Sequence, residues 1–169
     1  MKNKNKFEVI IENLEEDETL VIGEEIFVNE IISDESLQCA LLGTINFLEV
    51  TFQTIDFTGS TFVKCEFKNC RLKDVIFRKC DFWNVTFENC QIEESNFTRT
   101  TFNNGGFRNC KFLTKSLRAS YFSNFQFIET KFDKSNLDFI GALSIKVSKS
   151  NQFIIEESFN LGDFLSYGI

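Results

Sequence analysis

The stretch FVKCEFKNCRLKDVIFRKCDFWNVTF, residues 62–87, contains the pattern that decides the fold. A Phe, or a Leu in one case, recurs at every fifth position from Phe62 to Phe87. The position two residues before each later repeat is Cys or Val. An α-helix repeats every 3.6 residues and a strand every two, so neither element alone produces a five-residue period. The pattern therefore predicts a repeat structure built from pentapeptides.

The same register extends over twenty consecutive pentapeptides, whose closing positions run from Leu42 to Leu137. Fifteen of these positions are Phe, four are Leu and one is Ile, so this slot accounts for most of the 22 Phe residues. The position two residues earlier is nearly always small or β-branched. Both positions point inward only if the chain bends between pentapeptides, and four such bends close a square coil. We expect stacked coils whose backbone groups pair along the stack.

Matched residues twenty positions apart support a coil of four pentapeptides. Two sets of Asn have this spacing: Asn69, Asn89 and Asn109, and Asn84, Asn104 and Asn124. Asn suits a corner because it tolerates left-handed backbone geometry, and stacked amides bond to one another along a column. In an inward column the large Phe125 follows Gly105, which would leave room for the ring.

This pattern resembles that of the pentapeptide repeat family, whose usual motif is a small residue, a polar residue, Leu or Phe, and two variable residues. The resemblance covers about residues 40–139. It implies an all-β fold, a right-handed quadrilateral β-helix. Twenty pentapeptides would form about five coils, stacked about 4.8 Å apart.

Three regions of one structural domain are expected from this register. Residues 1–39 would form an acidic N-terminal cap or degenerate coils, because their inward positions hold Glu25, Glu30 and Glu35, and unpaired Glu is costly to bury. A β-rich cap is the favoured interpretation, and an acidic binding surface is the alternative. Residues 40–139 would form the β-helix.

Residues 140–169 are expected to cover the other end of the β-helix. Residues 144–147 suit a last strand, and residues 153–169 are typical of a short amphipathic helix followed by a tail. Some pentapeptide repeat proteins dimerise through such a segment, so the resemblance suggests a homodimer through this C-terminal region.

Composition argues against several classes of protein. The chain has no His, which removes the usual general base near neutral pH and the commonest zinc ligand. No apolar run approaches the roughly 18 residues of a membrane span, and acids interrupt the apolar core that a signal peptide needs after the basic residues 1–6. We therefore expect a cytoplasmic protein with reduced Cys and no membrane association.

Five of the six Cys occupy the inward small position, and Cys39 is the exception. Stacked Cys70, Cys90 and Cys110 permit a disulfide or metal interpretation, since a spacing of about 4.8 Å falls within the disulfide range. A metal site needs ligands that converge on one point, and the chain has neither His nor CxxC. We favour Cys as a small hydrophobic residue, and expect no metal or cofactor.

Five outward residues are candidates for contact with a protein partner. Arg78, Arg99 and Arg118, together with Lys79, form a basic stripe that suits an acidic partner. The only Trp, Trp83, shares an outward face with Tyr121, and Trp, Tyr and Arg are favoured at protein interfaces.

No pair of side chains has a catalytic pattern, so we expect a non-enzymatic protein–protein interaction scaffold with an unknown protein partner. The alternative is a DNA mimic that binds DNA gyrase or topoisomerase IV and protects it from quinolones or other inhibitors, as the resemblance to quinolone-resistance members of the family implies. Mimicry of DNA requires an excess of acidic residues on the β-helix itself. Residues 1–39 hold 11 acids and three bases, net −8, whereas residues 40–139 hold 11 acids and 13 bases, net +2. The scaffold therefore ranks first, and no direct binding to nucleic acid is expected.

Overall fold

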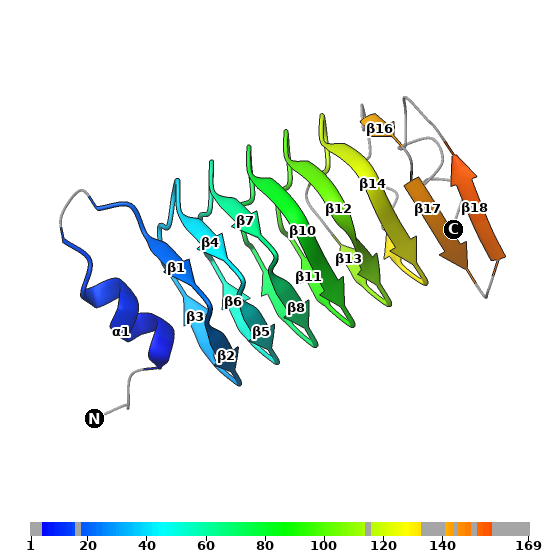
Figure 1. Ribbon diagram of the computed structural model, residues 1–169. Coiled ribbons are helices and arrows are strands. Elements are labelled where there is room, and N and C mark those ends of the chain that lie inside the picture. Colours follow the sequence, from blue (N-terminus) through cyan, green and yellow to red (C-terminus); the bar gives the residue numbers. More distant parts are fainter. Residues whose placement is uncertain are drawn as a thin grey trace.

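The protein is a β-solenoid in this computed structural model, with its coils arranged in a row behind an N-terminal helix (Figure 1). The structure describes residues 5–15, 18–113, 116–132, 141–143, 145–149 and 152–156. Each strand of a coil pairs in parallel with the strand twenty residues later, as in Asp81 with Thr101 and Thr101 with Tyr121. This register confirms four pentapeptides per coil. The coils number about six, one more than the sequence predicted.

The first and second faces of the solenoid belong to one sheet. The first face holds β1 (Val21–Gly23), β4 (Leu41–Gly43), β7 (Thr61–Val63) and the first halves of β10 (Asp81–Glu88), β12 (Thr101–Arg108) and β14 (Tyr121–Ile128). The second face holds β2 (Ile26–Val28), β5 (Asn46–Leu48), β8 (Glu66–Lys68) and the second halves of β10, β12 and β14.

The third face is a separate sheet, and the fourth face is held by single bridges. The third face holds β3 (Ile31–Ser33), β6 (Thr51–Gln53), β9 (Arg71–Lys73), β11 (Gln91–Glu93), β13 (Lys111–Leu113) and β15 (Lys131–Phe132). On the fourth face, isolated parallel bridges connect Ser36, Asp56, Ile76, Asn96 and Ser116 in succession. Residues 96–101 lead from the fourth face through a corner at Arg99 to the first face of the next coil.

The corners require left-handed backbone geometry. A positive φ recurs two residues after the central buried residue of the pentapeptides, for example 55° at Asn69 and 54° at Asn84. Asn adopts this conformation readily, whereas most other residues are strained in it. The Asn columns are confirmed, since Asn89 Nδ2 donates to Asn69 Oδ1 at 3.2 Å and Asn124 Nδ2 donates to Asn104 Oδ1 at 2.5 Å.

Columns of stacked Phe rings fill the interior. The ring centroids of Phe62 and Phe82 lie 4.8 Å apart, and those of Phe82 and Phe102 lie 4.9 Å apart, with interplanar angles of 12° and 6°. Rings on neighbouring faces meet edge to face, as Phe82 and Phe87 do at 63°. Offset stacks and edge contacts are both favourable aromatic arrangements. The recurrent Phe therefore forms one continuous core.

The predicted relation between Gly105 and Phe125 is confirmed. The two residues are paired in register, and Phe125 is buried with its ring against Phe102 and Phe107 of the preceding coil. Gly105 has a φ of 149°, and a Cβ at this position would lie 2.0 Å from the Val85 carbonyl oxygen. Only Gly allows the backbone to come this close.

At many of the small inward positions the side chain is a hydrogen-bond donor as well as small. Ser60 Oγ donates to the Leu37 carbonyl at 3.0 Å, and Cys80 Sγ donates to the Phe57 carbonyl at 2.9 Å. The same contact, with the carbonyl twenty-three residues earlier, is made by Cys65, Cys70, Cys90, Thr100, Cys110, Ser120 and Thr130. Buried carbonyls are costly to leave unpaired, which explains the choice of Cys, Ser and Thr.

Burial also keeps Cys65 and Cys80 in the thiol form. It raises the pKa of Cys65 to about 11 and the pKa of Cys80 to about 12. All six Cys are free, and of these Cys39 is exposed. A buried thiol with a raised pKa is a poor nucleophile, so Cys65 and Cys80 act as small core side chains. A hydrogen bond with the neighbouring Cys90 lowers the pKa of the buried Cys70 and Cys110.

The prediction of a β-rich N-terminal cap is wrong, because a helix covers this end of the solenoid. The helix α1 (Lys6–Glu12) covers this end, with Phe7 buried and its ring centroid 5.2 Å from that of Phe27. Asn5 caps the helix, since its side chain accepts from the Glu8 N–H at 2.8 Å. The helix thereby extends the Phe column beyond the first coil.

The first coil, residues 21–40, is regular rather than degenerate. Its Glu25, Glu30 and Glu35 are only half-buried. Lys6 pairs with the Glu25 carboxylate, and the Phe7 N–H donates to Glu30 Oε2 at 3.2 Å. The carboxylates find polar partners in the capping helix because no coil precedes this one, so Glu is tolerated here.

At the other end, the prediction of a strand near residues 144–147 is confirmed, whereas the prediction that a helix begins at residue 153 is wrong. The strand β17 (Ile145–Lys149) pairs in parallel with β14. Residues 153–156, which were expected to begin the helix, belong instead to the strand β18 (Gln152–Glu156), antiparallel to β17. The remainder of the expected helix, residues 157–169, lies outside the described residues. The structure also has β16 (Gly141–Leu143), which pairs with β14.

Candidate protein-interaction surface

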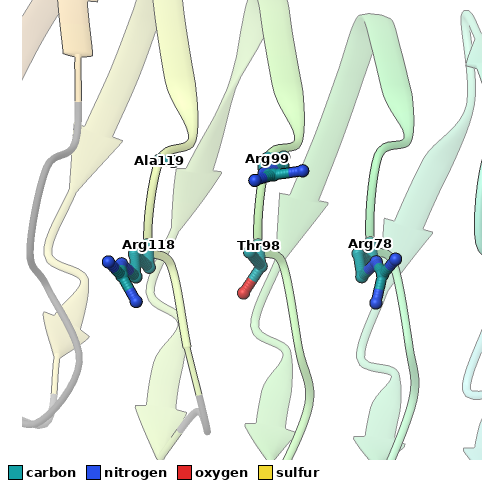
Figure 2. A pocket seen from close by; sticks show the side chains of 5 residues that line it. All are labelled: Arg78, Thr98, Arg99, Arg118 and Ala119. Atoms are coloured by element: carbon teal, nitrogen blue, oxygen red, sulfur yellow. The ribbon is translucent and has the colours of Figure 1, made fainter.

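Three arginines from successive coils lie around one shallow hollow. Arg78, Arg99 and Arg118 line it together with Thr98 and Ala119, and its volume is about 540 Å³ (Figure 2). The hollow spans the fourth face and the corner that leads to the first face. The predicted basic stripe is thus gathered at one site.

The hollow exists because short residues alternate with long ones. In one column of the fourth face, Thr98 lies between Arg78 and Arg118, which belong to the coils on either side (Figure 2). In the corner column, Ala119 follows Arg99. The short side chains of Thr98 and Ala119 leave the space that the three arginines surround.

Hydrogen bonds hold the backbone of the hollow in place. The Thr98 N–H donates to Asn96 Oδ1 at 2.9 Å, and Thr98 Oγ1 is 3.0 Å from Ser116 Oγ on the next coil. The Arg99 N–H donates to the Arg118 carbonyl at 3.0 Å. The side chains of the hollow therefore project from a rigid, cross-linked backbone.

A second, acidic hollow of about 340 Å³ lies nearer the N-terminal end, where the third face turns into the fourth. Its acidic residues are Asp34 and Asp74 at the corner, Glu35, and Asp56 on the fourth face. Burial, together with the charges of Glu8 and Asp34, raises the pKa of Glu35. Burial opposes the ionisation of Asp56, but hydrogen bonds from Thr58 and Gln38 outweigh it and lower its pKa.

The aromatic candidates lie on the adjoining first face, outside the arginine hollow. Trp83 on β10 is 45% exposed and Tyr121 on β14 is 40% exposed. Leu41, also exposed, and the half-buried Val63 lie on the same face. Lys79 shares the corner column with Arg99. The structure therefore gathers the three arginines and places both aromatics on the neighbouring face.

Two features of the surface were missed from sequence. One is the acidic hollow, whose members are dispersed over forty residues and meet only through the coil register. The other is a group of exposed β-branched residues on the first coil: Val21, Ile26, Val28 and Ile31. Their alternation with buried Ile22, Phe27 and Ile32 was a visible signal for regular strands in this region.

The described surface offers guanidinium and aromatic groups for contact with other molecules. In the parts of the chain that the structure describes, no three His, Cys, Asp or Glu side chains are grouped so as to hold a metal ion. None of the described helices has the length and apolar character needed to cross a membrane. Guanidinium groups and aromatic side chains remain as the groups that offer specific contacts.

A β-solenoid with four pentapeptides per coil defines a class of repeat protein. A family model described as a pentapeptide repeat region matches residues 36–104, and the solved structures with a similar fold include a pentapeptide repeat protein. The resemblance inferred from sequence, to the pentapeptide repeat family, is therefore confirmed. A search of curated proteins finds no significant match.

Two solved structures illustrate the likeness. A trypsin-treated variant of QnrB1, a plasmid-mediated fluoroquinolone resistance protein, is 17% identical with a TM-score of 0.54, covering 70% of this chain and 61% of that chain. HetL, a pentapeptide repeat protein involved in heterocyst differentiation regulation in the cyanobacterium Nostoc, is 10% identical with a TM-score of 0.60, covering 82% of this chain and 60% of HetL. The chain thus matches about three fifths of the length of each, and such identities show the fold alone.

Proposed function

We propose that this chain is a non-catalytic protein–protein interaction scaffold. Its partner contacts the arginine hollow and the adjoining first face, which carries Trp83 and Tyr121. The observation that carries the proposal is the division between the inside and the outside of the solenoid. Stacked Phe rings fill the interior, whereas the aromatic and cationic groups suited to recognition project from a rigid backbone.

A filled interior also supports a role without catalysis. The hollows are shallow and surface-borne, and the buried thiols Cys65 and Cys80 have raised pKa values. The pKa of Cys70 and Cys110 is lowered by a hydrogen bond with Cys90, but both thiols are buried in the core away from any hollow. Activated nucleophiles have lowered pKa values or an adjacent base. The chain therefore acts by presenting side chains to a partner rather than by transforming a substrate.

Affinity capture with the full chain tests the scaffold function. Wild-type protein is compared with Trp83→Ala and Tyr121→Ala, and with Val28→Ala as the matched control, because Val28 is 50% exposed on the second face. We expect the two aromatic variants to lose a partner that wild type and Val28→Ala both retain. Capture of the same proteins by all four forms would contradict the proposed surface.

A homodimer through the C-terminal segment is a separate proposal. Light scattering on the full chain and on a form without residues 150–169 tests it. A dimer that becomes a monomer on truncation supports it, and a monomeric full chain contradicts it.

The second candidate function, protection of DNA gyrase or topoisomerase IV, is supported by the fold that the chain shares with QnrB1. The net charge of +2 on residues 40–139 and the arginine hollow argue against mimicry of DNA. A gyrase supercoiling assay with and without a quinolone distinguishes the two functions. Dose-dependent protection or inhibition would place this candidate first.

A further inference from the structure

We propose that the hollow lined by Arg78, Arg99 and Arg118 binds the carboxylates of a short acidic segment of a protein partner. The inference rests on the proposed scaffold function and deepens it, since it states which chemistry of the partner this surface recognises. The first-face aromatics contact residues that flank the acidic segment.

The geometry suits carboxylates. Thr98 lies between Arg78 and Arg118, so these two arginines are separated by two coil spacings, about 10 Å at the backbone. Extended chain spans a similar length in about three residues. The planar guanidinium fork matches a carboxylate with two parallel hydrogen bonds, and so a segment with two or three acids fits along the hollow.

The charges near the hollow favour an external anion. The hollow brings three cationic side chains together and no acidic residue lines it among those described. Within the described part of the chain, neither Arg78 nor Arg99 forms a salt bridge. The carboxylate of Asp56, which the charge of Arg78 influences, already accepts from Gln38 Nε2 at 2.7 Å and from the Thr58 N–H at 2.8 Å.

A short protein segment fits better than a nucleic acid. The basic site extends over three coils only, and the acidic hollow reaches the same face nearer the N-terminal end. A long polyanion would meet these acids and the net charge of −7 on the whole chain. A short acidic peptide contacts the arginines alone.

Fluorescence anisotropy with a labelled hexaglutamate peptide and the full chain tests the inference at low salt. We expect saturable binding that weakens with salt, and about two- to fivefold weaker binding for each of Arg78→Ala, Arg99→Ala and Arg118→Ala, as for exposed ion pairs. Thr98→Leu fills the hollow without changing charge and should also weaken binding. Circular dichroism confirms that each variant is folded.

Two variants serve as matched controls. Arg108→Ala removes an exposed arginine from the second face, and Thr58→Leu makes the same change as Thr98→Leu two coils away in the same column. Both should bind the peptide as wild type does. If Arg108→Ala weakens peptide binding as much as Arg78→Ala does, the effect comes from the net charge of the protein and not from the hollow, and the inference is wrong.

Two other outcomes would also overturn the inference: no peptide binding, or tighter binding of a single-stranded DNA hexamer through the same arginines. The scaffold function is tested separately, by the capture experiment. A captured partner that needs Trp83 but tolerates replacement of all three arginines would leave the scaffold standing and exclude the acidic-segment site.

Discussion

The first coil, residues 21–40, and the central coil, residues 81–100, have the same backbone path but opposite chemistry at the inward small position. The first coil has Glu25, Glu30 and Glu35 there, and the central coil has Val85, Cys90 and Ser95. The central positions are buried between two coils, whereas Glu25 and Glu30 contact the capping helix. The inward position thus has different requirements at the end of the stack and within it.

The largest expected effect comes from exchanging the inward residues of the two coils, Glu in the first coil and Cys in the central one. Cys90→Glu places a carboxylate without a partner in the core, and we expect it to cost about 3–5 kcal/mol in free energy of unfolding. The converse Glu30→Cys removes only the acceptor of the Phe7 N–H, and should cost about 1 kcal/mol. Chemical denaturation measures both. Similar losses from the two variants would show that the end coil is as restrictive as the centre.

A glycine within the stack and a glycine in the first coil provide the next test. Gly105→Ala would bring a Cβ to 2.0 Å from the Val85 carbonyl oxygen at a φ of 149°, and we expect a loss of about 3 kcal/mol. Gly23→Ala in the first coil is the control, because its Cβ would lie at an ordinary 3.7 Å from the Gly43 carbonyl oxygen. Thermal unfolding should separate the two variants clearly. A tolerated Gly105→Ala would contradict the close approach of the coils.

Loss of one inward donor should have a smaller effect. Ser120→Ala removes the hydroxyl that donates to the buried Phe97 carbonyl, and we expect a cost of about 1–2 kcal/mol. Ser123→Ala, an outward position on the adjoining strand β14, should change the free energy of unfolding by less than about 0.5 kcal/mol. Equal effects would mean that the inward slot selects for size alone.

The smallest expected effect concerns pH. The pKa of Glu35 is raised in the folded state, so the folded state holds this proton more tightly than the unfolded state and ionisation of Glu35 destabilises the fold. Glu35→Gln should therefore raise stability near neutral pH. This gain should shrink as the pH falls through the raised pKa toward the ordinary value of 4.5. Denaturation at several pH values measures it, and a gain that grows toward acid pH would contradict the sign.

Much of the fold followed from the sequence because the repeat is local and regular. The five-residue period, the Asn columns and the space that Gly105 leaves for Phe125 all depend on residues at a constant spacing. The cap was mispredicted because the rule against burying Glu assumes a coil on both sides. Nothing in the spacing of Glu25 and Glu30 indicates that Lys6 and Phe7 return to meet them.

The candidate site, too, could be predicted only in part from the sequence. The sequence identified Arg78, Arg99 and Arg118 as outward residues of one stripe, because the register alone sets which way each side chain points. The hollow depends on what lies between them, namely the short Thr98 and Ala119 and the hydrogen bonds that hold their coils together. Such a space is a property of side-chain volumes across neighbouring coils, which one-dimensional spacing describes only in part.

By itself, the sequence determined that the chain coils with four pentapeptides per turn, that Phe fills the interior and that the net negative charge is concentrated in the first 39 residues. The first two features repeat along the chain, and each repeat is stabilised by its immediate neighbours. Only the tertiary structure decided how the stack ends and where its faces become hollow. Both depend on contacts that the repeat does not contain: a helix folded over the first coil, and short side chains between long ones.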